Sequence, residues 1–267
     1  MKEFIVRAIS GILYVSIILF TLFTSREWFL GLFFILALIT LNEFLKLQNT
    51  KGYIYYLILA LLFYFLSYKL YHIYAIYTLL IATIGVNLLL LTDLFSKRKY
   101  KLLNNKKMLG SIFYIISGFI FLTLIPFKNL NFIPEIVIAI FILIWANDTF
   151  AYLIGKSLGK HKLMERVSPK KTIEGFIGGL IGSIVISLLL FKYTDYYSVY
   201  IWIIIAILVS VFGTLGDLIQ SKIKRTAGVK DSGKLMPGHG GLYDRLDSVI
   251  YSSPFIYLFL QIMNYVS

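Results

Sequence analysis

The chain of 267 residues is 59% hydrophobic and only 15% charged, a composition outside the range of an ordinary soluble domain. Cysteine is absent, which excludes a disulfide framework, a catalytic thiolate and structural zinc bound through cysteine. The formal net charge is +13 and no DNA- or RNA-binding module is recognisable, so the basic residues favour anionic lipid head groups and nucleotides over nucleic acid. We therefore predict an all-α, polytopic integral membrane protein in contact with membrane lipids.

A membrane-spanning helix needs roughly 20 mostly apolar residues, each adding about 1.5 Å of rise. For the first candidate helix a signal peptide is the alternative, because Lys2 and Arg7 precede an apolar run. No small-residue cleavage site follows Phe23, so we expect a retained helix. The sequence predicts about nine transmembrane helices, near residues 8–24, 27–45, 53–68, 73–95, 108–126, 132–154, 174–191, 199–220 and 246–265.

Nine helices divide the 26 basic residues unevenly between the two sides of the membrane. The N-terminus and the loops after the second, fourth, sixth and eighth helices hold 22 of them. The positive-inside rule makes that side cytoplasmic. The N-terminus is therefore expected in the cytoplasm and the C-terminus outside the cell.

No linker or low-complexity segment divides the chain, and we expect a single continuous membrane domain. Every potential catalytic cluster lies after residue 140. Residues 1–130 are accordingly predicted to be N-terminal scaffold helices, and residues 131–267 a C-terminal catalytic region.

The first polar cluster interrupts the sixth predicted helix at Trp145–Tyr152. An ionised Asp148 facing lipid would cost several kcal/mol, so its carboxylate should face a partner or a wet cavity. Tyr152 follows at i+4 on the same helical face and would line the same pocket. The alternative is that Asp148 pairs with a cation and serves helix packing only.

The second cluster, Ser168–Gly175, precedes the seventh predicted helix. Thr172 can cap that helix and Glu174 is favourable in its first turn. Lys170 and Lys171 lie beside the free N–H groups of the helix start, an arrangement that suits phosphate. A plain capped helix start with flanking lysines is the alternative.

Four glycines then recur at spacings of three and four residues in the seventh predicted helix. Small residues at such spacing let two membrane helices approach closely. We expect close helix packing at Gly175, Gly178, Gly179 and Gly182.

The third cluster is the segment Ser221–Asp247, dense in cations, glycines and carboxylates. Asp217 precedes it, and Asp244 and Asp247 are spaced i, i+3, so three carboxylates at adjoining helix ends could hold one or two hard cations such as Mg²⁺. The glycines of 237–241 allow a close backbone approach. Phosphates would be neutralised by Lys222, Lys224, Arg225, Lys230 and Lys234. The alternative is a helix start whose carboxylates pair with loop cations.

This segment resembles the signature of the phosphatidate cytidylyltransferase family, also called CDP-diacylglycerol synthase. The pattern S-x-x-K-R-x-x-x-x-K-D-x-x-x-x-x-P-x-H-G-G-x-x-D-R-x-D is complete between Ser221 and Asp247. The segments Asp148–Gly155 and Ser168–Gly175 are also similar to the family. The resemblance is strong over residues 140–250 and rests on hydropathy alone before residue 130.

The resemblance implies transfer of a cytidylyl group from CTP to phosphatidate, with Mg²⁺ required, at a site facing the cytoplasm in a bacterial inner or plasma membrane. It implies catalytic roles for Asp217, Asp244, Asp247, Lys224 and Arg225, and makes the three aspartates the candidate metal ligands. The implied substrate-binding residues are Asp148, Ser168, Lys170, Lys171, Thr172, Glu174, Ser221, Lys230, Asp231, His239, Gly240, Gly241 and Arg245. A homodimer is expected by family analogy only.

Three alternatives stay open at this stage. An anion or lipid transporter would distribute polar residues through the bilayer depth, whereas here they concentrate near the cytoplasmic ends, apart from Asp148, Asn87 and Glu43. A second alternative is a transferase that acts on another lipid phosphate. A non-catalytic scaffold is the third. His239 could also hydrogen-bond a backbone carbonyl instead of shaping a nucleotide loop.

Overall fold

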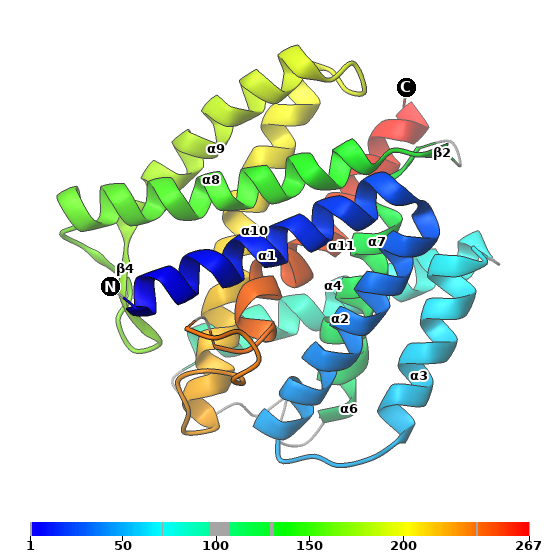
Figure 1. Ribbon diagram of the computed structural model, residues 1–267, viewed down its shortest axis with the longest axis horizontal. Helices are drawn as coiled ribbons and strands as arrows, with labels where there is room; N and C mark the ends of the chain where they lie inside the picture. The colour runs from blue at the N-terminus through cyan, green and yellow to red at the C-terminus, as the bar shows by residue number, and fades with distance from the viewer. Residues whose placement is uncertain (1, 71, 97–106, 129–130, 239, 267) are drawn as a thin grey trace.

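The computed structural model describes residues 2–70, 72–96, 107–128, 131–238 and 240–266, and it is almost entirely helical (Figure 1). Only two short antiparallel hairpins of two strands each interrupt the helices in these ranges. The helices are α1 (Lys2–Thr24), α2 (Arg26–Leu47), α3 (Ile54–Leu62), α4 (Ile73–Phe95), α6 (Lys107–Gly110), α7 (Ser117–Leu124), α8 (Pro134–Leu158), α9 (Ile173–Tyr193), α10 (Val199–Thr226) and α11 (Tyr243–Val266). Two π-helical segments, η1 (Phe63–Tyr68) and η2 (Ser111–Ile116), continue α3 and precede α7, and the strands are β1 (Phe127–Lys128), β2 (Asn131–Phe132), β3 (Lys162–Met164) and β4 (Ser168–Thr172).

The predicted fold class is confirmed, but the count of nine membrane spans is not. Seven helices of the described residues are long and apolar enough to cross a membrane. Two further apolar helical segments, Ile9–Thr24 and Ile54–Tyr68, coincide with predicted spans but are shorter. Every predicted span thus corresponds to a helical segment. Ile54–Tyr68 is shorter than the usual crossing length, whereas Ile9–Thr24 is part of the longer helix α1 (Lys2–Thr24).

Helices α8 and α9 lie side by side, and α10 packs against both (Figure 1). The close approach of α8 and α9 depends on the predicted glycines of α9, which are Gly175, Gly178, Gly179 and Gly182. A Cβ atom added at Gly179 would lie 2.7 Å from Oδ1 of Asn147, and one at Gly182 would lie 2.2 Å from a ring carbon of Phe150. The packing role expected for these glycines is therefore confirmed for α9 against α8.

Helix α11 packs against α10 on one side and α7 on the other, and it is among the most buried helices. Pro254 lies inside α11 and cannot donate a hydrogen bond to the carbonyl of Ile250. Gly118 of α7 approaches that carbonyl so closely that an added Cβ would lie 2.7 Å from its oxygen. Gly216 of α10 is equally close to the backbone of Asp247. These approaches bring the carboxylates of α10 and α11 to one place.

Contacts among the described residues join segments at two ends of the helix bundle. At one end, Lys107 donates to the carbonyl of Gln48, and Ser10 donates to the carbonyl of Pro237. At the other end, Lys128 donates to the carbonyl of Tyr196. Figure 1 places the start of α1 beside β4 and the end of α11 beside β2, so the chain termini lie at different ends.

We predict that Gly179→Ala lowers the free energy of unfolding by about 1–3 kcal/mol, because the new methyl group must displace the backbone of Asn147. Gly85→Ala is the matched control, since an added Cβ there meets nothing within 4 Å. It should be neutral or stabilising, because alanine favours a helix by roughly 1 kcal/mol over glycine. Thermal unfolding in detergent measures both, and equal stability of the two variants would contradict this account of α8–α9 packing.

Candidate active site

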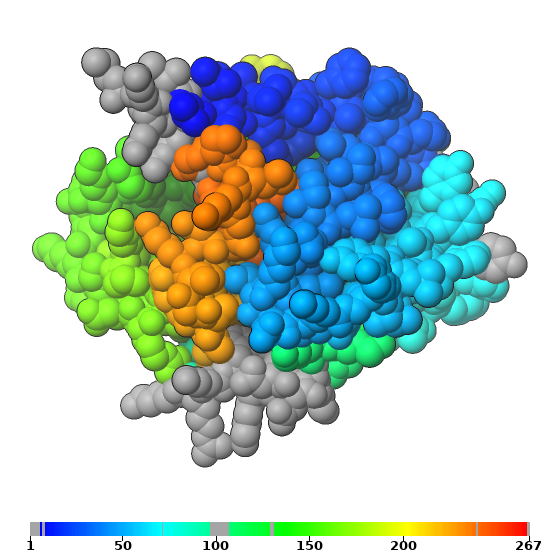
Figure 2. Space-filling view, turned by 60° about the horizontal axis from the view of Figure 1, so that its bottom comes forward, coloured from blue at the N-terminus to red at the C-terminus, as the bar shows by residue number. Residues whose placement is uncertain are grey.

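A cavity of about 770 Å³ opens between α1, α8, β4, α9, α10 and the start of α11. Ten of the predicted site residues line it. Figure 2 shows this face of the molecule, with the loop that follows α10 (orange) flanked by the β3–β4 hairpin (yellow-green) and by α1 (dark blue). The predicted residues in the lining are Asp148, Lys170, Lys171, Thr172, Asp217, Lys224, Asp231, Asp244, Arg245 and Asp247.

Lys171 is the cation around which three of these carboxylates gather. Its Nζ lies 2.5 Å from Oδ2 of Asp217, and both side chains are about one-third exposed, at 30% and 33%. Burial works against the charge on Lys171, but the carboxylates of Asp217, Asp148 and Asp247 outweigh it and raise the pKa of Lys171 above its usual value. Asp148 also lines this cavity, and its carboxylate is close enough to act on the charge of Lys171.

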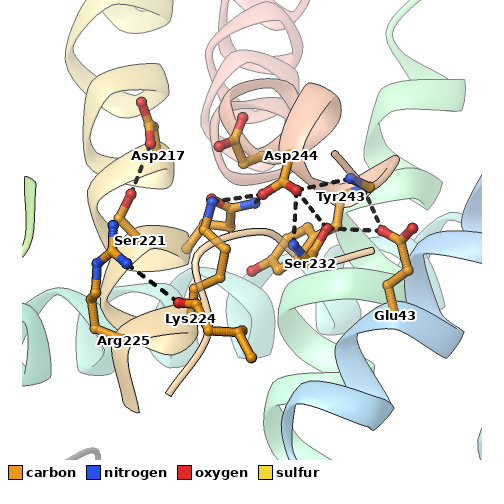
Figure 3. A network of polar contacts seen from close by, with 12 residues as sticks. Glu43, Asp217, Ser221, Lys224, Arg225, Ser232, Tyr243 and Asp244 are labelled. Carbon is orange, nitrogen blue, oxygen red and sulfur yellow. Dashed lines mark hydrogen bonds and ion pairs between the residues drawn. The ribbon is translucent and has the colours of Figure 1, made fainter. Parts of the chain in front are cut away.

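The carboxylate of Asp244 is held by a separate network (Figure 3). Its Oδ1 accepts hydrogen bonds from Lys224 at 2.6 Å and from the amide of Gln220 at 2.8 Å. Its Oδ2 accepts from the backbone N–H of Ser232 at 2.8 Å, from that of Gly241 at 3.0 Å, and lies 3.0 Å from the Ser232 hydroxyl. Lys224 and Asp244 are only 13% and 4% exposed, so this ion pair is well shielded from water.

Glu43 of α2 reaches the same loop from the N-terminal region (Figure 3). Its carboxylate accepts hydrogen bonds from the backbone N–H groups of Leu242 at 3.1 Å and Tyr243 at 2.9 Å, at the start of α11. Its Oε2 also lies 3.0 Å from the hydroxyl of Ser232. The scaffold region therefore contributes a buried acid to the surroundings of the site.

The other predicted residues support the cavity from outside its lining. Ser221 donates to Oδ1 of Asp217 at 3.2 Å, one turn along α10. Arg225 is exposed and donates to the carbonyl of Val229 at 3.4 Å. Both lie on α10, which continues to Thr226, beyond the predicted end of that helix near residue 220.

The cluster before α9 forms the strand β4 and a capped helix start. Thr172 accepts a hydrogen bond from the Gly175 N–H at 3.1 Å, so its predicted capping role is confirmed. Glu174 turns back to the residues just before β3, where it accepts from the backbone N–H groups of Lys160 and His161 and lies 2.6 Å from Nδ1 of His161. Ser168 begins β4 and is half-buried. The sequence prediction missed this β3–β4 hairpin.

The prediction that every cation of the third cluster faces phosphate is wrong for Lys222. It is 7% exposed and donates to the carbonyls of Asp93 and Ser96, at the C-terminal end of α4. Arg166, from the β3–β4 hairpin, donates to the carbonyl of Leu94 at 3.0 Å. Cations are favourable at a helix C-terminus, where backbone carbonyls have no intrahelical partner. Lys222 therefore has a structural role at that helix end.

A second hollow of about 590 Å³ lies along the loop that follows α10. It shares Asp231 and Arg245 with the central cavity and adds Lys230 and Gly240 of the predicted set. Gly240 has a φ of +88°, a conformation that suits glycine, and an added Cβ would lie 2.7 Å from Oδ2 of Asp244. His239 lies outside the described residues.

The three predicted metal ligands stand in different surroundings. Among the described residues, no group of three or more acidic, histidine or cysteine side chains is arranged to hold a metal ion. All three line the cavity. Asp244 accepts hydrogen bonds from several protein donors, and Asp217 is held by Lys171 and Ser221. Of the two carboxylate oxygens of Asp247, Oδ1 accepts a hydrogen bond from the N–H of Ser248, and Oδ2 has no hydrogen-bond donor among the described residues. Asp247 therefore has a carboxylate oxygen available for a hard cation, and Asp217 can offer one in exchange for its contact with Lys171, with the remaining ligands left to substrate or water.

Sequence reasoning missed four residues at this site. Glu43 and Ser232 hold the loop, and Gln220 donates to Asp244. Tyr14 of α1 lines the cavity, and its buried hydroxyl has no hydrogen-bond partner among the described residues. Glu43 was noticed only as an acid inside a predicted span, and such an acid is by itself the signal of a functional neighbour.

Comparisons with known proteins identify the family. The cytidylyltransferase family profile matches residues 5–263, nearly the whole chain. The chain belongs to the cytidylyltransferase family. The family resemblance read from the sequence is thereby confirmed, and the match extends through the N-terminal region that carries Glu43.

Relatives with assigned names agree with this family. The chain is 32% identical over 265 residues to a protein named phosphatidate cytidylyltransferase from Bacillus subtilis (strain 168), covering 97% of this chain and 98% of that protein. It is 37% identical over 166 residues to a protein of the same name from Staphylococcus aureus (strain COL), and 34% identical over 174 residues to one from Staphylococcus saprophyticus. Those two matches span 62% and 65% of either chain.

We predict that Lys224→Met lowers the stability of this protein by about 1–3 kcal/mol, because it leaves the shielded Asp244 carboxylate without its cation. Arg225→Met is the matched control for stability, since the exposed Arg225 should cost no more than about 0.5 kcal/mol. Thermal unfolding in detergent compares the two. A similar loss of thermal stability in both variants would show that the Lys224–Asp244 pair does not stabilise the fold more than an exposed cation does.

Proposed function

We propose that this protein is a phosphatidate cytidylyltransferase, which uses CTP and phosphatidate to make CDP-diacylglycerol and pyrophosphate. The observation that supports it best is the single cavity in which α8, β4, α10 and α11 bring together carboxylates and cations from all three sequence clusters. The family match and the names of the relatives agree with it. The clusters are far apart in sequence, so their convergence is the feature that a scaffold protein would not need.

The reaction is one displacement at phosphorus. An oxygen of the phosphatidate phosphate forms a bond to the α-phosphorus of CTP, while the bond from that phosphorus to the oxygen bridging to the β-phosphate breaks. The electron pair leaves with pyrophosphate. The attacking phosphate is largely ionised at neutral pH, because the second pKa of a phosphomonoester is about 6. No general base or covalent enzyme intermediate is required.

The cations of the cavity divide into two groups. Lys171 and Lys224 are already paired with Asp217 and Asp244, so their main effect is to fix those carboxylates. Lys170 and Arg245 line the cavity and form no ion pair within the described ranges. We assign these two, with Lys230 of the adjoining hollow, to the phosphates of the substrates.

The need for Mg²⁺ is part of this proposal. Asp247 and Asp217 are the residues that would hold it. Asp247 accepts a hydrogen bond from the Ser248 N–H alone among the described residues, and Asp217 would exchange its contact with Lys171 for the cation. When bound, such a cation neutralises charge that develops on the transferring phosphoryl group and the departing pyrophosphate. Asp244 instead positions Lys224 and the glycine-rich loop.

The membrane position follows from the same features. One substrate dissolves in the bilayer and the other in water, so the site must lie where helix ends meet the membrane surface. The cation-rich loops gather at the end that carries the cavity, which favours the cytoplasmic side of a bacterial inner membrane. The homodimer expected from the family resemblance stays a prediction, and the mass of the detergent-solubilised protein tests it.

The first test is pyrophosphate release by the purified protein with phosphatidate and Mg²⁺, comparing CTP with ATP, GTP and UTP. We expect release with CTP that depends on phosphatidate and falls by at least about 10²-fold in Asp247→Asn. Asp195→Asn is the matched control, because Asp195 is exposed in the loop between α9 and α10. Pyrophosphate release that depends on a different lipid phosphate would support another lipid-phosphate transferase. No release with any nucleotide from folded protein would favour a transport function.

The metal assignment is tested by titrating Mg²⁺ into EDTA-treated enzyme. We expect Asp217→Asn to raise the Mg²⁺ concentration for half-maximal activity by about tenfold, the effect of losing roughly 1.4 kcal/mol of binding. Asp244→Asn should lower activity without that shift, because its carboxylate is occupied by protein donors. Equal shifts in the two variants would make Asp244 a ligand as well.

A further inference from the structure

We propose that Glu43 of α2 is a positioning residue for the loop between α10 and α11, residues 227–242, which we assign to the nucleotide. Glu43 caps the start of α11 from another helix. Through Ser232 it also fixes the positions of Asp244 and Lys224. The proposal rests on the proposed function, because it assigns the loop to CTP. It gives the N-terminal helices a part in the chemistry that neither the sequence motifs nor the family name assigns to them.

The cap is defined by two backbone contacts. Glu43 is 6% exposed, and its two carboxylate oxygens accept from the N–H groups of Leu242 and Tyr243. The first N–H groups of a helix have no partner within that helix and carry partial positive charge. Glu43 therefore does for α11 what an N-cap side chain usually does, but from a residue about 200 positions earlier in the chain.

Two glycines of the loop leave the space that this carboxylate fills. A Cβ added at Gly233 would lie 2.4 Å from Oε1 of Glu43, and one at Gly241 would lie 2.5 Å from Oε2. Neither glycine has a φ in the left-handed region, so the backbone conformation does not require glycine at these two positions. At Gly233 the side chain of Glu43 lies closest to the backbone, and at Gly241 the hydroxyl of Ser232, 2.2 Å from the added Cβ, is closer still.

Ser232 connects Glu43 to the catalytic network. Its hydroxyl oxygen lies 3.0 Å from Oε2 of Glu43 and 3.0 Å from Oδ2 of Asp244. A hydroxyl has only one proton to donate, so it satisfies one of the two carboxylates at a time. The two acids therefore share one donor, and a change at Glu43 alters the hydrogen bonding of Asp244.

The role requires the carboxylate and not only its shape. No ion pair to Glu43 occurs among the described residues, so its charge is balanced by the two N–H groups and the helix start. In Glu43→Gln one of these N–H groups faces an amide NH₂ and loses its acceptor. Losing a buried acceptor costs more than losing an exposed contact, because the donor stays dry and unpaired.

The test compares the wild type with Glu43→Gln and Ser232→Ala in the pyrophosphate-release assay. We expect KM for CTP to rise by about tenfold in Glu43→Gln, which corresponds to ~1.4 kcal/mol, while KM for phosphatidate stays the same. A merely structural role would lower the active fraction and hence kcat, and leave both KM values unchanged. The double variant should be no worse than the poorer single one, since both changes break one linkage.

Glu27→Gln is the matched control. It makes the same chemical change on the same helix, at an exposed residue in the first turn of α2. It should keep KM for CTP within about twofold of the wild type. Glu43→Gln with KM for CTP also unchanged would overturn the proposal, whatever its effect on stability.

Amide hydrogen exchange separates a failure of this proposal from a failure of the proposed function. Exchange at Leu242 and Tyr243 needs no substrate, and we expect it to be about tenfold faster in Glu43→Gln than in Glu27→Gln. If the wild type is inactive with CTP but exchange at Leu242 and Tyr243 is faster in Glu43→Gln, the proposed substrate is wrong and the capping of α11 by Glu43 is supported. Unchanged amide exchange in Glu43→Gln would contradict the capping role of Glu43, whatever the activity of the protein.

Discussion

Charge held inside an apolar scaffold must be compensated within a few ångströms, and this requirement organises the rest of the structure. Lys171 pairs with Asp217, and Lys224 pairs with Asp244, at 2.5 and 2.6 Å. Each pair joins two different elements, β4 to α10 and α10 to α11. The pairs therefore fix the helix ends around the cavity as well as the charges in it, and they leave Lys170 and Arg245 for phosphate.

Much of this could be predicted because the relevant physics is local. Apolar runs of about 20 residues predict membrane helices, and the glycine spacing before Gly182 predicts a close helix contact that the structure confirms. Thr172 could be assigned as a cap from its position before an apolar run. The uneven distribution of cations likewise predicts which loops meet at one end of the bundle.

The rest could not be predicted because it depends on contacts between distant segments. Lys222 follows the same pattern as its neighbours, and only the position of α4 shows that it binds carbonyl groups at a helix end. The β3–β4 hairpin is too short and too polar to give a strand pattern. Asp244 and Asp247 share a helix spacing that predicts one role, yet the loop surrounds one of them and leaves the other to the cavity.

The contact between Glu43 and the start of α11 also has a consequence for biogenesis. Its partners are 199 and 200 residues further along the chain, so at about 5–20 residues per second the ribosome needs on the order of ten to forty seconds to deliver them. Throughout that interval α2 is already made, and its acid has no protein donor from α11. The loop at the site is thus completed only when the last helix is inserted, and a nascent chain that stalls before residue 243 has an unclosed cavity.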